Sequence, residues 1–146
     1  MTLVSMRRRG ANRPVRHCGL RLRHDPAELK RARAFAEAAA ARFGLDRTAR
    51  QDFKLAASEA VANAIEHGRP CFDGAIHLWT AEADTTLTLG VRNGGEFTFA
   101  PPAADPLAER GRGLILMAGL VDEVALSRIG DDIQIELSKE RPDGDR

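Results

Sequence analysis

Residues 57–68 read ASEAVANAIEHG, and their small apolar letters recur with the period of a helix. Apolar side chains three and four residues apart share one helical face. The predicted buried stripe consists of Phe53, Ala56, Ala57, Ala60, Val61, Ala64 and Ile65. We therefore predict a helix that begins near Asp46 and ends at Gly68, where Arg69-Pro70 breaks it.

Three polar residues within this stretch share another face of the same helix. Glu59 and Asn63 are four residues apart, and His67 follows one turn later. One interpretation is a set of solvated polar side chains. The other is a site in which the Asn63 amide oxygen holds a cation beside a proton acceptor, Glu59.

The chain on the N-terminal side of this helix predicts a strand and a second helix. Apolar residues alternate with other residues over 15–23, as in a strand. Asp25 is placed to cap a helix, with Pro26 in its first turn and Glu28 completing a capping box. A helical stripe follows and Gly44 closes it; the stripe is Leu29, Ala32, Ala36, Ala39 and Phe43.

On the C-terminal side the pattern changes from helical to alternating. Two strands, 76–83 and 85–92, are joined by a turn at Asp84, and a glycine- and proline-rich loop covers 93–110. A short helix over 113–120 and two strands over 121–128 and 132–138 follow. This order does not alternate as βαβ units do, so we expect an α+β two-layer sandwich, a mixed and mostly antiparallel sheet with helices on one face.

Length and composition indicate one globular domain. The chain has 146 residues, of which 43% are hydrophobic and 29% charged, which excludes a disordered or collagen-like chain. No run of about 18 apolar residues occurs, so we expect no membrane span. The first sixteen residues contain no apolar core of signal-peptide length, so we expect a cytoplasmic protein.

The charge is unevenly distributed along the chain. The net charge is +1, but the first sixteen residues carry five arginines and no acid, which leaves 17 basic and 21 acidic side chains and a charge of −4 beyond them. We expect a flexible basic leader over 1–14, a domain over 15–139 and a polar tail over 140–146. The leader either keeps the chain soluble or makes weak contacts with acidic partners or nucleic acid. A mildly acidic domain indicates no direct, specific nucleic-acid binding.

Cys18 and Cys71 are too few for a disulfide scaffold or a four-cysteine zinc site. We expect two reduced thiols. A mixed metal site that combines them with His17, His67 and His77 is the open alternative.

A second glycine-containing segment, Gly111-Arg112-Gly113-Leu114, stands where the short helix opens. Glycines let a backbone approach a ligand closely, and the free N–H groups of a helix N-terminus attract phosphate. A simple turn and cap is the alternative. No GxxxxGK[ST] segment occurs, which excludes a Walker-type phosphate loop. Asn93-Gly94-Gly95 either lines the same pocket or forms an ordinary turn.

Together these segments resemble one known family. Residues 57–68 are similar to the N-box of the anti-sigma factor serine kinases, which belong to the Bergerat-fold (GHKL) ATPases with histidine kinases and type II topoisomerases. The run GRGLILM at 111–117, with LVDEV at 120–124, resembles the second glycine box of that subfamily and the segment after it. The likeness covers roughly residues 15 to 138.

The resemblance implies a role for each matching position. Glu59 would be the general base that takes the proton of a substrate serine, and Asn63 would bind Mg²⁺ through its side-chain oxygen. The loop from Gly94 to Arg110 would cover ATP. The other residues implied in nucleotide binding are His67, Asn93, Gly95, Arg110, Gly111, Arg112, Gly113 and Leu114. Transfer of this kind depends on positioning and charge neutralisation.

The chain departs from the family at the adenine site. The family has Asp-x-Gly-x-Gly-Phe in the first glycine box, whereas this chain has Asn93 at the aspartate and Phe97 at the second glycine. A Gly-Thr pair near the last strand is replaced by Gly130-Asp131-Asp132. An asparagine offers an uncharged acceptor and a weaker hydrogen bond. Asp132 is a candidate for the missing carboxylate.

Two functions follow from the resemblance. The first is an ATP- and Mg²⁺-dependent serine kinase and anti-sigma factor that phosphorylates a STAS-type anti-anti-sigma protein, binds a sigma factor and forms a homodimer. The second is a binding module of the same fold that holds one of these partners without phosphorylating it. A histidine-kinase catalytic domain fits less well, because no phosphoacceptor-histidine helix precedes the domain.

Overall fold

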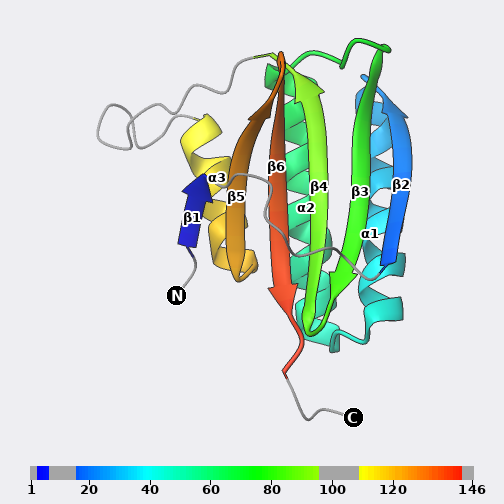
Figure 1. Cartoon of the computed structure of the whole chain (residues 1–146), viewed down its shortest axis with the longest axis vertical. Helices are drawn as coiled ribbons and strands as arrows, with labels where there is room; N and C mark the ends of the chain where they lie inside the picture. The colour runs from blue at the N-terminus through cyan, green and yellow to red at the C-terminus, as the bar shows by residue number, and fades with distance from the viewer. Residues whose placement is uncertain (1–2, 7–15, 96–108, 143–146) are drawn as a thin grey trace.

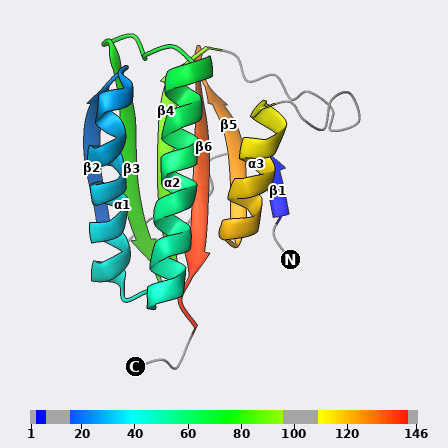
Figure 2. The ribbon, with the colours of Figure 1, turned by 180° about the vertical axis from the view of Figure 1, so that it is seen from behind.

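The computed structural model describes residues 3–6, 16–95 and 109–142, and the side chains of 18–95 and 115–142. A sheet forms one layer and the helices form a second layer on one of its faces (Figures 1 and 2). The strands are β1 (Leu3–Met6), β2 (Arg16–Arg23), β3 (Ala75–Ala83), β4 (Thr86–Gly94), β5 (Glu123–Ile129) and β6 (Asp132–Glu140). The helices are the short 3-10 helix η1 (Pro26–Glu28), α1 (Leu29–Phe43), α2 (Arg47–His67) and α3 (Glu109–Leu120).

The strand order across the sheet is β1-β5-β6-β4-β3-β2. Every neighbouring pair is antiparallel except β1 and β5, which are parallel. The α+β sandwich with a mixed, mostly antiparallel sheet and helices on one face is therefore confirmed. Figure 2 shows α2 at the centre of the helical layer, with α1 on one side of it and α3 on the other.

Helix α2 forms where the sequence predicts it. The Asp46 carboxylate accepts a hydrogen bond of 2.8 Å from the Ala49 N–H, which caps the helix. The seven residues of the predicted stripe are all buried. They pack with α1 and the helix-facing residues of the strands into one core, in which Phe53, Leu78, Leu87, Leu89 and Leu137 are almost fully enclosed.

The start of the first helical segment differs in one contact from the prediction. Asp25 accepts from the Ala27 N–H as a cap should, but Glu28 does not close a capping box on Asp25. Its carboxylate accepts instead from the Arg23 N–H at 2.8 Å and pairs with Arg31 at 2.9 Å. The Arg23 N–H, and then Arg31, hold the pKa of the buried Glu28 below its ordinary value.

Two segments differ from the prediction more clearly. Helix α3 begins at Glu109, not at residue 113, so the predicted glycine segment lies inside the helix. Strand β1 falls within the expected leader, and its residues pair with Glu123 to Leu126 of β5. Of the predicted loop 93–110, residues 93–94 end β4 and 109–110 begin α3, while 96–108 lie outside the described residues. No described helix is long and apolar enough to cross a membrane.

Candidate functional site

The polar face of α2 lies on the flank turned toward α3. Lys54 reaches Glu37 of α1 at 3.4 Å, and Arg33 of α1 reaches Ser58 at 3.5 Å, so the opposite flank of α2 packs beside α1. Residue 63 lies about 140° around the helix axis from residue 58 and about 180° from residue 54, on the far flank. Glu59 and Asn63 are both partly exposed. Neither side chain has a hydrogen-bond or ion-pair partner among the described residues, so both have donor or acceptor capacity left for a ligand.

His67 occupies the last turn of α2 on the same flank. Its Nε2 atom is buried and has no hydrogen-bond partner among the residues that the structure describes. The Oε2 atom of Glu66 lies 3.7 Å away, beyond hydrogen-bond distance. A buried ring nitrogen without a partner is costly unless a ligand or water satisfies it. This geometry fits the predicted place of His67 in a ligand site.

Helix α2 ends directly against the end of β4. Asn93 is 6% exposed, and its Nδ2 donates to the Gly94 carbonyl at 2.9 Å. A β-carbon at Gly68 would lie 2.1 Å from Asn93 Nδ2 and 2.8 Å from the Ala64 carbonyl oxygen. A side chain at position 68 would therefore collide with Asn93, and glycine is the residue that permits the contact.

A two-way backbone bridge fixes the same junction. The Arg69 N–H donates to the Gly94 carbonyl at 3.0 Å, and the Gly94 N–H donates to the Arg69 carbonyl at 2.8 Å. Gly95 follows with φ of 111°, a conformation that side chains rarely adopt. The structure thus brings His67, Asn93 and Gly95 together at one end of α2. Sequence patterns did not reveal the bridge, because it joins residues 25 positions apart.

Asp132 does not join this group. It stands opposite Gly94 in the β4–β6 ladder, while Asn93 stands opposite Ile133. Directly opposed residues share a face and neighbours alternate, so Asp132 and Asn93 lie on opposite faces of the sheet. The Asp132 carboxylate accepts a hydrogen bond of 2.9 Å from Arg92 Nε. This placement argues against Asp132 as a substitute for the adenine-binding carboxylate.

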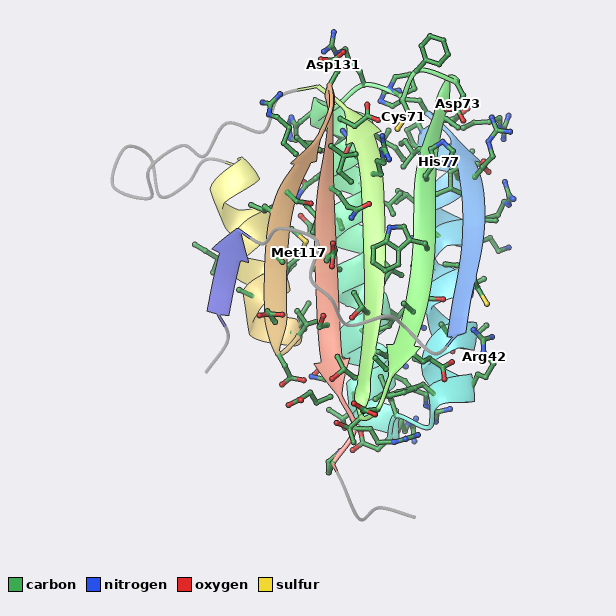
Figure 3. The ribbon with its side chains drawn as sticks, in the orientation of Figure 1. Arg42, Cys71, Asp73, His77, Met117 and Asp131 are labelled. Atoms are coloured by element: carbon green, nitrogen blue, oxygen red, sulfur yellow. The ribbon has the colours of Figure 1, made fainter. Side chains whose placement is uncertain are left out.

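The second glycine segment belongs to the first two turns of α3. Arg110, Gly111, Arg112, Gly113 and Leu114 all have helical backbone, and their side chains lie outside the described ones. Helix α3 packs along α2, with Met117 fully buried between the helix and the sheet (Figure 3). The glycine segment is therefore carried on a helix that packs beside the Asn63 flank of α2.

One polar cluster at the same end of the sheet was not predicted. Asp73 accepts from Ala75 N–H at 3.1 Å and pairs with His77 at 2.8 Å and Arg21 at 3.2 Å. Desolvation alone would raise the Asp73 pKa, but the Ala75 N–H and His77 together hold it below the ordinary value. Figure 3 shows Cys71, Asp73 and His77 close to one another at this end.

Cys71 in this cluster is a buried thiol that donates to the Arg92 carbonyl at 3.5 Å. Burial, reinforced by the Asp132 carboxylate, raises its pKa to about 11. Both cysteines are free thiols, in agreement with the expectation of reduced cysteines. Among the described residues, no three His, Cys, Asp or Glu side chains gather closely enough to hold a metal ion.

Comparison with known families identifies the family of the chain. The family model described as "Histidine kinase-like ATPase domain" matches residues 22–139. The chain belongs to this family. Members of an ATPase domain family bind ATP, and the matched range contains Glu59, Asn63, Asn93 and the first turns of α3.

A solved structure has a similar fold. It is the crystal structure of the RsbU and RsbW domains of Rv1364c from Mycobacterium tuberculosis, with a TM-score of 0.66 and 24% identity. The match covers 88% of this chain and 34% of the other, so this chain spans about a third of that protein. A search of curated proteins gave no match. These comparisons confirm the Bergerat-type fold of the histidine kinase-like ATPase domains.

Proposed function

We propose that the protein is an ATP- and Mg²⁺-dependent protein serine kinase that also acts as an anti-sigma factor. Its substrate is a serine of a STAS-type anti-anti-sigma protein, its other partner is a sigma factor, and the active form is a homodimer. Membership of the ATPase domain family supports ATP as the cofactor. The N-box and the glycine segment, which resemble those of the anti-sigma factor kinases, support the choice of substrate and partners.

The observation that carries the proposal is that the Glu59 and Asn63 side chains have no partner among the described residues. Both lie on the α3-facing flank of α2, partly exposed and without a described partner. A structural carboxylate in this position would be expected to pair with a neighbouring cation, as Glu28 pairs with Arg31. A carboxylate held ready for a substrate has no such partner, because a cation at its side would weaken it as a base.

The residues present fit the implied cofactor. The Asn63 amide oxygen is a hard donor of the kind that Mg²⁺ prefers. His67 offers an unsatisfied buried nitrogen, and the glycines at 68 and 94 let the end of α2 and the end of β4 pack closely together. The helical N–H groups at the start of α3 suit phosphate oxygens.

Each residue then has one task in the transfer. Bound ATP supplies the phosphoryl group. Glu59 would accept the proton from the serine hydroxyl as the serine oxygen bonds to the γ-phosphorus. The bond from that phosphorus to the β-phosphate oxygen would break, and ADP would leave with the negative charge. Asn63 holds the cation that offsets this charge. The close contact between Gly68 and Asn93 fixes the position of the C-terminal end of α2 relative to β4. It thereby also fixes the position of Asn63 along α2.

The test is a titration with Mg²⁺ and ATP followed by a phosphotransfer assay on STAS-domain proteins of the source organism. The proposal expects saturable ATP binding and phosphate on one serine of one STAS protein. ATP binding without transfer to any of them would contradict it.

A second candidate function is a binding module that holds the same partners without phosphorylating them. The specific observation in its favour is Asn93. This residue stands where the family has an aspartate, and its side-chain amide donates a hydrogen bond to the Gly94 carbonyl. Asp132, the candidate for the missing carboxylate, pairs with Arg92 on the other face of the sheet. Partner binding that is independent of ATP would favour this function over the first.

A further inference from the structure

Exposed apolar side chains are concentrated on the helical layer. Among the described residues four large hydrophobic side chains are exposed: Leu55 (50%), Phe72 (106%), Ile115 (65%) and Leu116 (42%). Phe72 is in the loop between α2 and β3. The other three lie on α2 and α3, two helices that pack against each other and run in opposite directions (Figure 2). We call Leu55, Ile115 and Leu116 the apolar patch.

Lys139 of β6 fixes the relative height of the two helices. Its Nζ donates to the Leu120 carbonyl at 3.0 Å and lies 3.9 Å from the Asp52 carboxylate. Asp52 is therefore level with the last turn of α3. At about 1.5 Å per residue, Leu55 stands roughly 4.5 Å above that level and Leu116 roughly 6 Å above it. The two leucines are thus at nearly the same height.

Both leucines also face the outer side of the helical layer. Phe53, Ala57 and Ala60 of α2 are buried against the sheet, so Leu55 points nearly opposite to them. Met117 of α3 faces the core, and the right-handed turn of α3 puts Leu116 on its α2 flank, where it is still partly exposed. The apolar patch therefore lies along the outer side of the α2–α3 contact.

The patch adjoins the proposed general base. Leu55 and Glu59 are four residues apart on α2 and share a face, about 6 Å apart along the axis. A serine hydroxyl must come within about 3 Å of the base. A folded protein that presents this serine covers far more surface than the serine alone, since protein interfaces involve about 800 Å² per partner. It must then lie over the surface one helical turn from Glu59.

We infer that the apolar patch is the docking surface for the protein substrate, which carries an apolar surface beside its phosphorylated serine. The inference rests on the proposed kinase function. It assigns affinity for the substrate protein to Leu55, Ile115 and Leu116, separately from the chemistry at Glu59 and Asn63. Contact of apolar side chains at the centre of an interface gives affinity, while the base and the metal site act on the transferred group.

The test compares Leu55→Asp and Leu116→Asp with Phe72→Asp as the matched control. All three put a charge on an exposed apolar site, but Phe72 is not in the patch. The measurements are steady-state phosphotransfer to the STAS substrate, the ATP affinity and the molecular mass in solution. Melting temperatures check that each variant is folded. We expect the KM for the STAS protein to rise about tenfold or more in both patch variants, with kcat at saturation, ATP affinity and the control unchanged.

The other possible outcomes distinguish a failure of the docking surface from a failure of the proposed kinase function. Transfer by the parent with an unchanged KM in both patch variants would overturn the docking surface and leave the kinase function intact. A fall in molecular mass in the patch variants, with an unchanged KM, would assign the patch to a second copy of the chain and would also overturn the inference. If the parent transfers phosphate to no STAS protein, the proposed function fails and the docking surface falls with it.

Discussion

Asn93 Nδ2 lies so close to Gly68 that a β-carbon at position 68 would come within 2.1 Å of it. This contact joins the end of α2, which carries Glu59 and Asn63, to the end of β4, which carries the first glycine segment. The Arg69–Gly94 bridge beside it adds two backbone hydrogen bonds. The polar face of α2 and the glycines of β4 are therefore held as one unit.

Gly68→Ala should disrupt this unit. The added methyl group meets the Asn93 amide and the Ala64 carbonyl, so the α2 end must move away from β4. Overpacking of this kind costs about 1–3 kcal/mol of stability, and we expect ATP binding to weaken as well. Gly119→Ala is the matched control, because a β-carbon at this helical glycine meets nothing within 4 Å. Gly119→Ala should be as stable as the parent or more so, and a Gly68→Ala variant that behaves the same way in denaturant titrations would refute the tight contact.

Asn93→Asp should tighten ATP binding and lower the stability of the free protein. The carboxylate restores a charged acceptor for the adenine amino group, which makes a stronger hydrogen bond. The Gly94 carbonyl keeps its hydrogen bond from the Arg69 N–H, but the new carboxylate is a buried charge that faces this carbonyl without a partner, which lowers stability. ATP titrations and melting curves measure the two effects separately. Weaker ATP binding in the variant would show that position 93 does not serve the adenine.

Asn63→Ala should weaken ATP binding only when magnesium is present. The substitution removes one neutral oxygen ligand from a cation that prefers six. Asn63 is partly exposed and has no described partner, so the fold should tolerate the change. Parallel titrations with Mg²⁺ and with a chelator provide the comparison. An equal loss in both would mean that Asn63 is structural.

The two cysteines should differ in reactivity. Cys71 is buried with a thiol pKa of about 11, whereas Cys18 is half-buried. Near pH 8 a thiol reagent should therefore modify Cys18 in the folded protein and Cys71 only after unfolding. Equal rates in the native protein would contradict the buried position of Cys71.

The same thiol predicts an alkaline loss of stability. The folded-state pKa of Cys71 lies above its ordinary value of 9.0, so the folded protein retains a proton that the unfolded chain releases first. Its contribution is complete below pH 9 and is lost as the pH rises from 9 to about 11. Melting temperatures across this range should fall less in Cys71→Ala than in the parent.

Local patterns predicted the helices well, and contacts between distant segments were what they missed. The Asp46 cap and the seven-residue stripe of α2 depend on neighbours a few positions apart, so their period is visible in the sequence. The pairing of β1 with β5 joins residues about 120 positions apart, and four residues in an arginine-rich segment are too short for an alternation to show.

In the candidate site, too, local spacing was predictable and contacts between distant segments were not. Glu59, Asn63 and His67 share a helical face, which their spacing predicts. The separation of Asp132 from Asn93 depends on the register between β4 and β6, which no local pattern specifies. The start of α3 was placed too late because Gly111 and Gly113 are typical of loops, whereas both have helical backbone in α3.

The most direct measurement of the central claim is phosphotransfer to the STAS substrate by Glu59→Ala, with ATP affinity measured on the same sample. Glu59→Gln serves as the control of similar shape. A general base is worth roughly 10²–10⁴ in rate, so both variants should lose at least a hundredfold in kcat while their ATP affinity stays near that of the parent. Transfer at the parent rate by either variant would show that Glu59 is not the base.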